Sequence, residues 1–267
     1  MSVGERALAG PLSVQLTEIV ARLRPATLVE TVEAAELQTR FDRKYVLPPS
    51  AVASLVRELG NEIQALQIGQ ERCAAYESVY FDTPDRHSYR GANTERRRRW
   101  KVRTRTYAES GECMLEVKTR DAHGQTAKER MPHAVGAGRH LTNAALAFIA
   151  ERVRLPDQGR ELSPVLTTRY RRATLLDRAA GVRLTIDTDL VCTATNGNAI
   201  SLSDHLLVET KSTGAPTAAD RLLWSAGFRP MAISKFGVGL AGTDPTLSAN
   251  RWNRPLRRYF GWTPARR

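Results

Sequence analysis

Cysteine is scarce in this chain of 267 residues, which contains only Cys73, Cys113 and Cys192. The three lie far apart and show no paired spacing, which argues against a disulfide framework or a zinc site and is typical of a reducing compartment. No hydrophobic run reaches the length of a membrane-spanning helix, and the first residues lack the apolar core of a signal peptide. We therefore expect a cytoplasmic protein without a transmembrane segment.

The motifs of the common nucleotide-binding and hydrolytic folds are also missing. The sequence has no GxxxxGK[ST] phosphate loop, no GxGxxG after a strand, no HExxH and no GxSxG. Its five histidines do not show the spacing of metal ligands. P-loop enzymes, dinucleotide-binding folds, zinc proteases and serine hydrolases are therefore not indicated.

Positive charge is what the sequence has in excess. Lys and Arg number 40 against 28 Asp and Glu, which gives a formal net charge of +12. Such an excess predicts an anionic partner, either nucleic acid, an acidic membrane surface or a polyanionic small molecule. An apolar content of 42% is ordinary for a globular protein with a core, and the length suits one large domain with terminal extensions.

The hydrophobic pattern predicts an antiparallel sheet with a few helices. Two-residue alternation and turn signals mark about eight strands, at residues 39–47, 76–81, 97–107, 113–120, 126–133, 164–176, 182–191 and 205–211. Helices are expected at residues 12–23, 50–59, 143–153, 220–227 and 234–240, with Ser50 as one N-cap. After Thr243 the chain is expected to be irregular and basic.

The charges in these strands follow the two-residue period of a strand. Lys101, Arg103 and Arg105 fall on one face of their strand, and Arg97 and Arg99 would continue that face. Six strands each place a cation, often with an acid, opposite their apolar residues. One such strand is typical of a sheet with a solvated face. Six together, with like charges repelling one another across strands, favour a bound polyanion that compensates them.

The acids on the same faces permit two interpretations. These residues are Asp42, Glu116, Asp187, Asp189 and Glu209. They could pair with the neighbouring cations. One or two carboxylates together with phosphate oxygens are also the usual way to hold Mg²⁺ or Mn²⁺. The run from Arg96 to Arg99 is more typical of a solvated edge or turn than of a nucleic-acid site.

Eight short segments, in order along the chain, resemble the catalytic domain of the vacuolar transporter chaperone (VTC) family, which belongs to the triphosphate tunnel metalloenzymes. They are Arg40-Phe-Asp-Arg-Lys-Tyr45, Tyr80-Phe-Asp-Thr-Pro84, Lys101-Val-Arg-Thr-Arg105, Leu115-Glu-Val-Lys118, Tyr170-Arg-Arg172, Val182-Arg-Leu-Thr-Ile-Asp-Thr-Asp189, Val208-Glu-Thr-Lys211 and Ser234-Lys-Phe236. Each is modest alone, and the shared order makes them specific.

The resemblance implies an α+β fold, an eight-stranded antiparallel β tunnel closed as a barrel, with flanking helices. We expect the tunnel domain at residues 36–243, between an N-terminal helical extension at 1–35 and a basic tail at 244–267. In this family the tunnel binds a nucleoside triphosphate and polyphosphate. The eukaryotic members transfer the ATP γ-phosphoryl group onto polyphosphate with a divalent metal. The resemblance thus implies a polyphosphate polymerase that uses ATP, inorganic polyphosphate and Mn²⁺ or Mg²⁺, and it disfavours nucleic acid as the partner.

The resemblance also implies the site residues. Positions that match the family's phosphate-binding residues are Lys44, Arg103, Arg105, Lys118, Arg172, Arg183, Lys211 and Lys235. Of these, the expected catalytic set is Lys44, Arg103, Arg105, Lys118 and Lys211. Glu209 matches the metal-holding acid, with Glu116 and Asp187 as further candidates. Hydrolytic relatives often open with Glu-x-Glu-x-Lys, whereas this chain has Arg40-x-Asp42-x-Lys44, which favours the polymerase branch.

Three alternatives stay open. The first is a metal-dependent triphosphatase or polyphosphatase of the same fold. The second is a non-catalytic module that binds polyphosphate or another polyanion in a salt-dependent way. The third is a basic sheet protein whose charges bind nothing in particular.

Overall fold

A computed structural model describes residues 11–33, 41–154, 161–212 and 214–264. The chain divides into two compact units, which are described separately. Unit 1 comprises Met1–Ala74, Tyr170–Leu190 and Leu202–Ala232, and unit 2 comprises Ala75–Arg169, Val191–Ser201 and Ile233–Arg267. The domain boundaries expected after residues 35 and 243 stay predictions. Thr39 and Arg40, which were expected to open a strand, lie outside the described residues.

The sheet of unit 1 is built from four main strands. In hydrogen-bonded order they are β2 (Phe41–Leu47), β11 (Leu206–Ser212), β9 (Val182–Ala194) and β8 (Ser163–Asp177), of which β8 and β9 each have one end in unit 2. β11 runs antiparallel to both β2 and β9. Two short strands extend the sheet, since β3 (Gln64–Leu66) pairs with β8 and β1 (Arg24–Ala26) pairs with β3.

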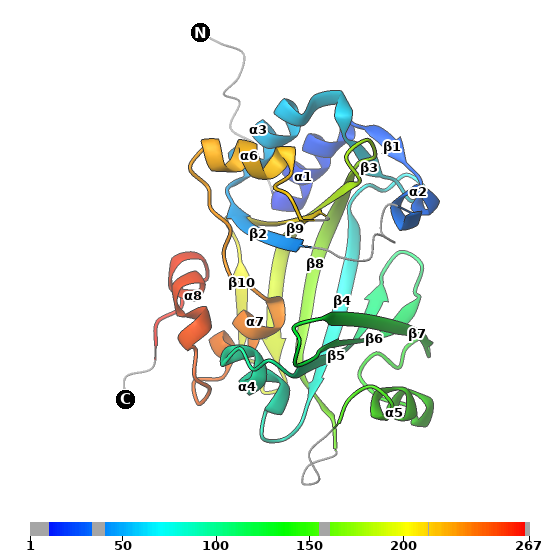
Figure 1. Ribbon diagram of the computed structural model, residues 1–267, viewed down its shortest axis with the longest axis vertical. Helices are drawn as coiled ribbons and strands as arrows, with labels where there is room; N and C mark the ends of the chain where they lie inside the picture. Colours follow the sequence, from blue (N-terminus) through cyan, green and yellow to red (C-terminus); the bar gives the residue numbers. More distant parts are fainter. Residues whose placement is uncertain (1–10, 34–40, 155–160, 213, 265–267) are drawn as a thin grey trace. The chain divides into compact units, whose positions relative to one another are not determined.

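In its described residues, unit 1 contains four helices and one 3₁₀ turn. They are α1 (Leu12–Ala21), α2 (Leu28–Glu33), α3 (Pro49–Leu59), the 3₁₀ turn η1 (Gly60–Glu62) and α6 (Ala218–Ser225). Of these, α1, α3 and α6 contribute to the core against the sheet. α1 packs on α3 and α3 on α6, at the top of Figure 1. The buried core joins Leu16, Leu55 and Leu223 of these helices to Tyr45 and Ile186 of the strands. Burial of one face in this way leaves the opposite face of the strands for polar side chains.

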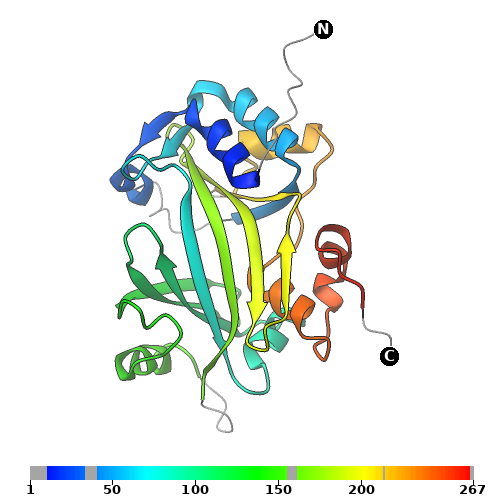
Figure 2. The same cartoon turned by 180° about the vertical axis from the view of Figure 1, so that it is seen from behind.

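The sheet of unit 2 continues from the first half of β8. β4 (Ala74–Asp82), β5 (Arg99–Tyr107), β6 (Cys113–Arg120) and β7 (Thr126–His133) follow in that order. β10 (Ala199–Leu202) pairs with β9, as Figure 2 shows. One face packs through Val102, Leu115 and Val117 against Ala145 and Ile149 of α5 (Asn143–Ala150).

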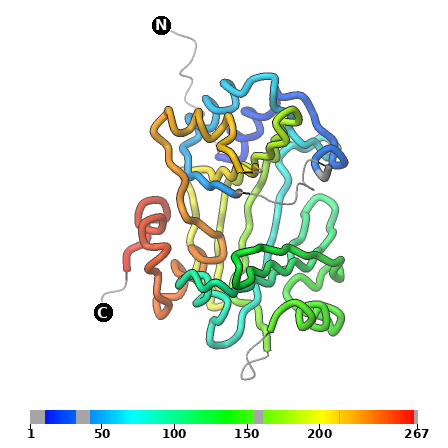
Figure 3. Tube along the Cα trace, in the orientation of Figure 1, coloured from blue at the N-terminus to red at the C-terminus, as the bar shows by residue number. Residues whose placement is uncertain are grey.

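Three further helices of unit 2 pack together on another side. They are α4 (His87–Asn93), α7 (Lys235–Thr243) and α8 (Asn253–Tyr259), with the 3₁₀ turn η2 (Asn250–Trp252) before α8 (Figure 3). The expectation of an irregular chain after Thr243 is therefore wrong. Trp252 and Leu256 are buried against α7, and this packing rather than local propensity orders the segment.

The expected class, an antiparallel sheet with flanking helices, is confirmed, but the closed eight-stranded barrel is wrong. The sheet has eleven strands. Three of them, β1, β3 and β10, were not expected, because they contain only three or four residues and are too short to show alternation. Within the described part of the chain, β2 and β7 are the two end strands and do not pair with each other. β7 exposes most of its side chains, several of them charged, which is typical of a protected sheet edge.

Most expected elements occur within a few residues of their predicted bounds, with some local exceptions. The helix expected at residues 50–59 is α3, and its N-cap is Pro48 rather than Ser50. β5 begins at Arg99 and not at Arg97, because the chain turns through Glu95, whose φ is 55°. α4 was not expected, and it begins where Asp82 accepts hydrogen bonds from the backbone N–H groups of Ser88 and Tyr89. Within the described residues, no helix is long and apolar enough to cross a membrane.

Candidate functional site

The polar face of the unit 1 sheet carries the candidate residues of β2, β9 and β11. The register places Lys44 opposite Glu209, and it places Lys211 between Asp42 on one side and Arg183 on the other. Tyr45, Ile186 and Val208 alternate with these residues and point into the core. The two-residue period therefore distributes charge and apolar surface as the sequence predicted.

Glu209 is the acid at the centre of this face. Its Oε1 lies 2.5 Å from Lys211 Nζ and 3.8 Å from Lys44 Nζ. Burial would raise the pKa of Glu209, but the charges of Lys44 and Lys211 outweigh it and hold that pKa well below its ordinary value. Glu209 is therefore an ionised carboxylate between two ammonium groups.

Lys211 is shared by two acids. Its Nζ lies 3.3 Å from Asp42 Oδ1 as well as 2.5 Å from Glu209 Oε1. Two carboxylates and two ammonium groups thus alternate across β2 and β11. Because an ammonium group is a compact charge on a flexible stem, Lys44 and Lys211 can turn toward an incoming anion more easily than a planar guanidinium can.

Arg172 of β8 and Asp187 of β9 form a second ion pair in unit 1. Arg172 donates from Nε and from a terminal nitrogen to the two carboxylate oxygens of Asp187, at 2.5 and 2.8 Å. The Asp187 side chain is 2% exposed. A bidentate, buried pair of this kind fixes both side chains, so Asp187 orients the guanidinium of Arg172.

A buried network that was not expected from the sequence lies behind this face. Asp220 of α6 accepts hydrogen bonds from the hydroxyls of Tyr45 (2.7 Å) and Thr210 (2.8 Å), and Arg43 donates to it at 3.3 Å. Tyr45 and Arg43 flank Lys44, and Thr210 lies between Glu209 and Lys211. One buried carboxylate therefore anchors the backbone on both sides of the candidate residues.

The polar face of the unit 2 sheet is more strongly basic. Its register joins Arg103 to Glu116, Lys101 to Lys118, and Lys118 to Lys128. The cations that share this face are Arg99, Lys101, Arg103, Arg105, Lys118, Arg120, Lys128 and Arg130. Glu116 is the one acid that β5, β6 and β7 place among them.

Glu116 is surrounded by three of these cations. Its carboxylate lies 2.5 Å from Arg103, 3.6 Å from Arg105 and 2.8 Å from Lys128. Burial would raise the pKa of Glu116, whose side chain is 3% exposed, but the three cations hold that pKa well below its ordinary value. Partial burial and the repulsion of Arg103 and Arg105 lower the pKa of Lys128 to about 8.

Aromatic side chains support the arginines of this face. The guanidinium of Arg103 donates to the Tyr80 hydroxyl at 3.0 Å and lies 5.7 Å from the centre of that ring. Arg105 lies 5.5 Å from the centre of the Tyr76 ring. Stacking on a ring fixes a guanidinium plane without neutralising its charge, and the same two arginines pair with Glu116.

The first turn of α7 lies beside the same face. Ser234 is the N-cap, and its Oγ accepts hydrogen bonds from the Gly237 N–H (3.4 Å) and from Lys101 Nζ (3.1 Å). Lys101 Nζ lies 5.1 Å from the centre of the Phe236 ring. Lys235, the candidate residue of this segment, is the first residue of the helix. The positive end of α7 and Lys101 therefore face the same region of unit 2.

The candidate metal ligands differ in how well they fit a metal. The described residues contain no group of three or more His, Cys, Asp or Glu side chains arranged to hold a metal ion. Glu116 and Asp187, the further candidates, form ion pairs with guanidinium groups, and their role as metal ligands stays a prediction. Glu209 and Asp42, which share Lys211, supply the one or two carboxylates that suit Mg²⁺ or Mn²⁺ when phosphate oxygens complete the coordination.

Sequence reasoning missed several residues of these faces. Lys128 follows the two-residue alternation of its strand and could have been found by extending that pattern to residues 126–133. Ser234 and Tyr80 lie in the resembling segments without an assigned role. Asp189 breaks the expected alternation of β9, because its φ of 52° interrupts the extended backbone.

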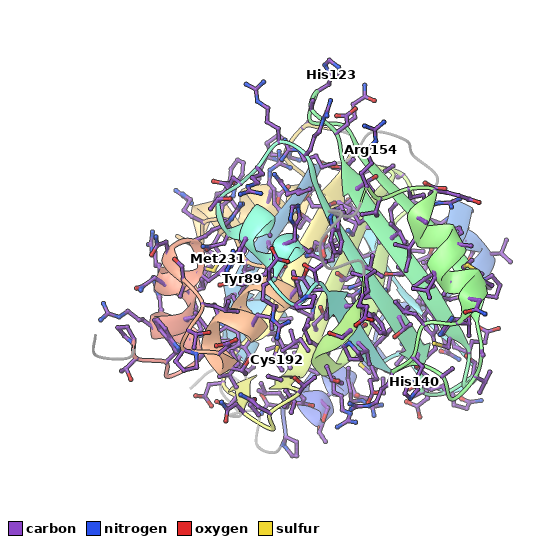
Figure 4. All side chains as sticks on the ribbon, turned by 90° about the horizontal axis from the view of Figure 1, so that it is seen from below. Tyr89, His123, His140, Arg154, Cys192 and Met231 are labelled. Carbon is purple, nitrogen blue, oxygen red and sulfur yellow. The ribbon has the colours of Figure 1, made fainter. Side chains whose placement is uncertain are left out.

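His123, His140 and Cys192 are not among the residues that the strand registers place on either face. Figure 4 shows His123 at the tip of the β6–β7 turn and His140 well apart from it. Cys192 is buried near the backbone carbonyl of Lys235, and burial raises the pKa of its thiol to about 12. A protonated, enclosed thiol is not a nucleophile.

Comparison with known proteins places most of the chain in one family. The family model described as the VTC domain matches residues 39–243. No curated protein matches the chain.

Three solved structures that match the chain are distant from it. A Hippeastrum protein described as a candidate adenylyl cyclase with a dominant triphosphatase activity is 18% identical at a TM-score of 0.49, covering 77% of this chain and 97% of that one. A candidate adenylate cyclase of Bacillus halodurans is 13% identical at a TM-score of 0.45, covering 74% of this chain and 94% of that one. A candidate adenylate cyclase of Vibrio parahaemolyticus is 11% identical at a TM-score of 0.42, covering 74% of this chain and 95% of that one. Similarity at this level assigns no activity to the chain.

Proposed function

Because this chain belongs to the VTC domain family, we propose that it is a triphosphate-processing enzyme that works as a polyphosphate polymerase. It transfers the γ-phosphoryl group of ATP onto inorganic polyphosphate. In this reaction the bond between the γ-phosphorus and the bridging oxygen breaks, ADP leaves, and a terminal oxygen of polyphosphate forms the new P–O bond.

The observation that carries this proposal is the excess of cations on two sheet faces. In unit 2, eight Lys and Arg side chains share the face with Glu116. In unit 1, Lys44 lies opposite Glu209, and Lys211 lies between Asp42 and Arg183. Like charges on neighbouring strands repel one another, so an arrangement of this kind is favourable when a polyanion compensates them. Phosphate chains have the charge density and the many acceptor oxygens that such faces require.

The chemistry of phosphoryl transfer suits these residues. The reaction depends on in-line positioning and on stabilising the charge of the transferred group, and it needs no protein nucleophile. In unit 2, the guanidinium groups of Arg103 and Arg105 are suited to phosphate oxygens, and in unit 1, Lys44 and Lys211 supply compact positive charges. The attacking oxygen of polyphosphate is already anionic, so no general base is required.

A divalent metal fits the unit 1 face in one place. Glu209, with Asp42 beside it, would hold Mg²⁺ or Mn²⁺ together with phosphate oxygens. When bound, the metal supplies charge neutralisation on the phosphates. Lys44 and Lys211 keep the Glu209 carboxylate ionised for that purpose and orient it on the sheet.

The experiment that tests the proposal follows products by size. Purified protein is incubated with ATP, Mn²⁺ and a short polyphosphate primer, and chain lengthening is expected. Arg105→Ala and Lys211→Ala should each abolish it while the protein stays folded. The matched controls are Arg169→Ala and Arg178→Ala, because these exposed arginines pair with Glu77 and Glu30 away from the two faces.

The same assay separates the other candidates. Orthophosphate release from tripolyphosphate without longer chains would replace the polymerase by a triphosphatase. Tight, salt-dependent binding of polyphosphate with no turnover would indicate a binding module. Full activity in both Arg105→Ala and Lys211→Ala would refute the assigned site.

A further inference from the structure

The segment that follows the family-matched residues packs directly on the first turn of α7. Trp252 is 3% exposed, and a Cβ placed on Gly237 would lie 2.3 Å from two carbons of the indole. Because carbon atoms do not approach so closely, residue 237 has to be glycine while the indole occupies this position. The ring therefore lies against the helix backbone itself.

The turn that Trp252 covers is the one that meets the basic face of unit 2. The Gly237 N–H donates to Ser234 Oγ, which also accepts from Lys101 Nζ at 3.1 Å. Phe236, between them, packs at 5.1 Å from the Tyr80 ring, whose hydroxyl accepts from Arg103. A continuous set of contacts thus runs from Trp252 through the turn to two cations of the face.

We infer that Trp252 is a positioning residue for phosphate binding in unit 2. It does not reach the phosphate itself. It fixes the first turn of α7, so that Ser234 and Lys235 are held beside Lys101 before the ligand arrives. This inference rests on the proposed function, and it gives the residues beyond the family-matched range a part in the same site.

The other end of α7 supplies a control for plain packing. Leu256 of α8 is buried against Gly242, where a Cβ would lie 3.1 Å from its methyl group. Gly242 is at the C-terminal end of the helix, seven residues beyond Lys235. Truncating Leu256 therefore removes buried contact between the same two segments without touching the turn that carries Ser234.

The experiment measures binding of tripolyphosphate without metal by calorimetry, with thermal unfolding alongside. Without the indole, ligand binding has to include the cost of ordering the first turn of α7, so we expect Trp252→Ala to weaken binding by roughly tenfold. Leu256→Ala should lower the melting temperature but change the dissociation constant by less than about twofold. Trp252→Phe keeps a ring on Gly237 and should restore most of the affinity.

Gly237→Ala tests the same contact from the other side. Its methyl group would displace the indole, so Gly237→Ala should weaken tripolyphosphate binding in the wild-type protein. In the Trp252→Ala background the indole is gone, and Gly237→Ala should cause no further loss of affinity. Should Trp252→Ala fail to fold, Gly237→Ala decides the question alone. Wild-type affinity in either variant, or an equal loss in Leu256→Ala, overturns the inference. A wild-type protein that does not bind tripolyphosphate refutes the proposed function instead.

Discussion

Lys211 and Glu209 lie two residues apart on β11, on the same face, with Nζ 2.5 Å from Oε1. The pair is stable while no ligand competes for either partner. A phosphate oxygen can take the ammonium group and a divalent cation can take the carboxylate, so that one ion pair is exchanged for two. The contact therefore keeps Glu209 ionised and both side chains oriented before substrate binds.

Glu209→Gln separates the role of this acid in metal binding from its role in the sheet. Glutamine keeps the shape but loses the charge that would hold Mg²⁺ or Mn²⁺. We expect ATP-dependent synthesis to fall by about a hundredfold or more, as when one electrostatic group is removed from an active site. Binding of tripolyphosphate without metal should be equal or tighter, because a negative charge has gone. Unchanged synthesis at all metal concentrations would contradict the metal role.

Asp187→Asn is expected to act on stability. The carboxylate is buried and holds Arg172 by two hydrogen bonds. Breaking a buried pair at one partner costs about 3 kcal/mol or more, because the guanidinium of Arg172 loses its bidentate partner. Urea unfolding should show this loss, while the metal concentration for half-maximal activity stays the same. A large shift in that concentration with unchanged stability would make Asp187 a metal ligand.

Acid should destabilise the fold through Glu116 and Glu209. Both have a pKa well below 4.5, because their cation neighbours favour the ionised form. In the unfolded chain these carboxyls titrate near their ordinary value. Their stabilisation is thus fully present above about pH 4.5 and is lost as pH falls toward the folded pKa. The melting temperature should fall with acid below that point, and Glu116→Gln should have a lower starting value and a shallower fall.

The sequence predicted which side chains share a face of a strand, but not which residues pair across neighbouring strands. Alternation alone put Lys44, Glu209 and Lys211 on one side of their strands, since the period of a strand is fixed by backbone geometry. Which acid meets which cation depends on register between strands far apart in the chain. Lys44 and Glu209 are 165 residues apart, and no local signal sets their pairing.

Long-range contacts also explain what sequence reasoning missed. Asp220 looks like an ordinary residue in the first turn of α6, where it completes a capping box with Thr217. Its hydrogen bonds to Tyr45 and Arg43 appear only when α6 lies on β2. The expectation of a closed barrel came from the family resemblance. Closure requires the end strands β2 and β7 to pair, and no local sequence pattern indicates whether two strands so far apart in the chain do so.

Asp220→Asn tests whether the network behind the unit 1 face supports binding. Asparagine keeps one acceptor oxygen and loses the charge that Arg43 pairs with. A buried hydrogen-bonded charge of this kind is worth about 1–3 kcal/mol, so unfolding in urea should shift accordingly. We also expect weaker tripolyphosphate binding, because Lys44 and Lys211 lose a fixed backbone. The control is Asp204→Asn, an exposed residue of the same unit. Loss of stability with unchanged affinity would limit Asp220 to a structural role.

Lys128 should make binding depend on pH in the mildly alkaline range. Partial burial, with Arg103 and Arg105 nearby, lowers its pKa to about 8, although its side chain is 46% exposed. Above that pH the free protein loses one positive charge from the unit 2 face. Affinity for ATP measured without metal should therefore decline as pH rises from 7 to 9, and bound ligand should raise the pKa of Lys128 through the same linkage.

Two variants of Lys128 test whether its titration causes the change in affinity. Lys128→Met removes the titrating group, so the decline between pH 7 and 9 should disappear and affinity should be low throughout. Lys128→Arg keeps the charge at every pH in this range, since a guanidinium does not lose its proton there. The affinity of the arginine variant for ATP should depend little on pH. Ionisation of ATP itself affects all three proteins equally, so it cancels when their pH profiles are compared. If Lys128→Met retains the wild-type pH profile, another group titrates, and the lowered pKa of Lys128 has no part in binding.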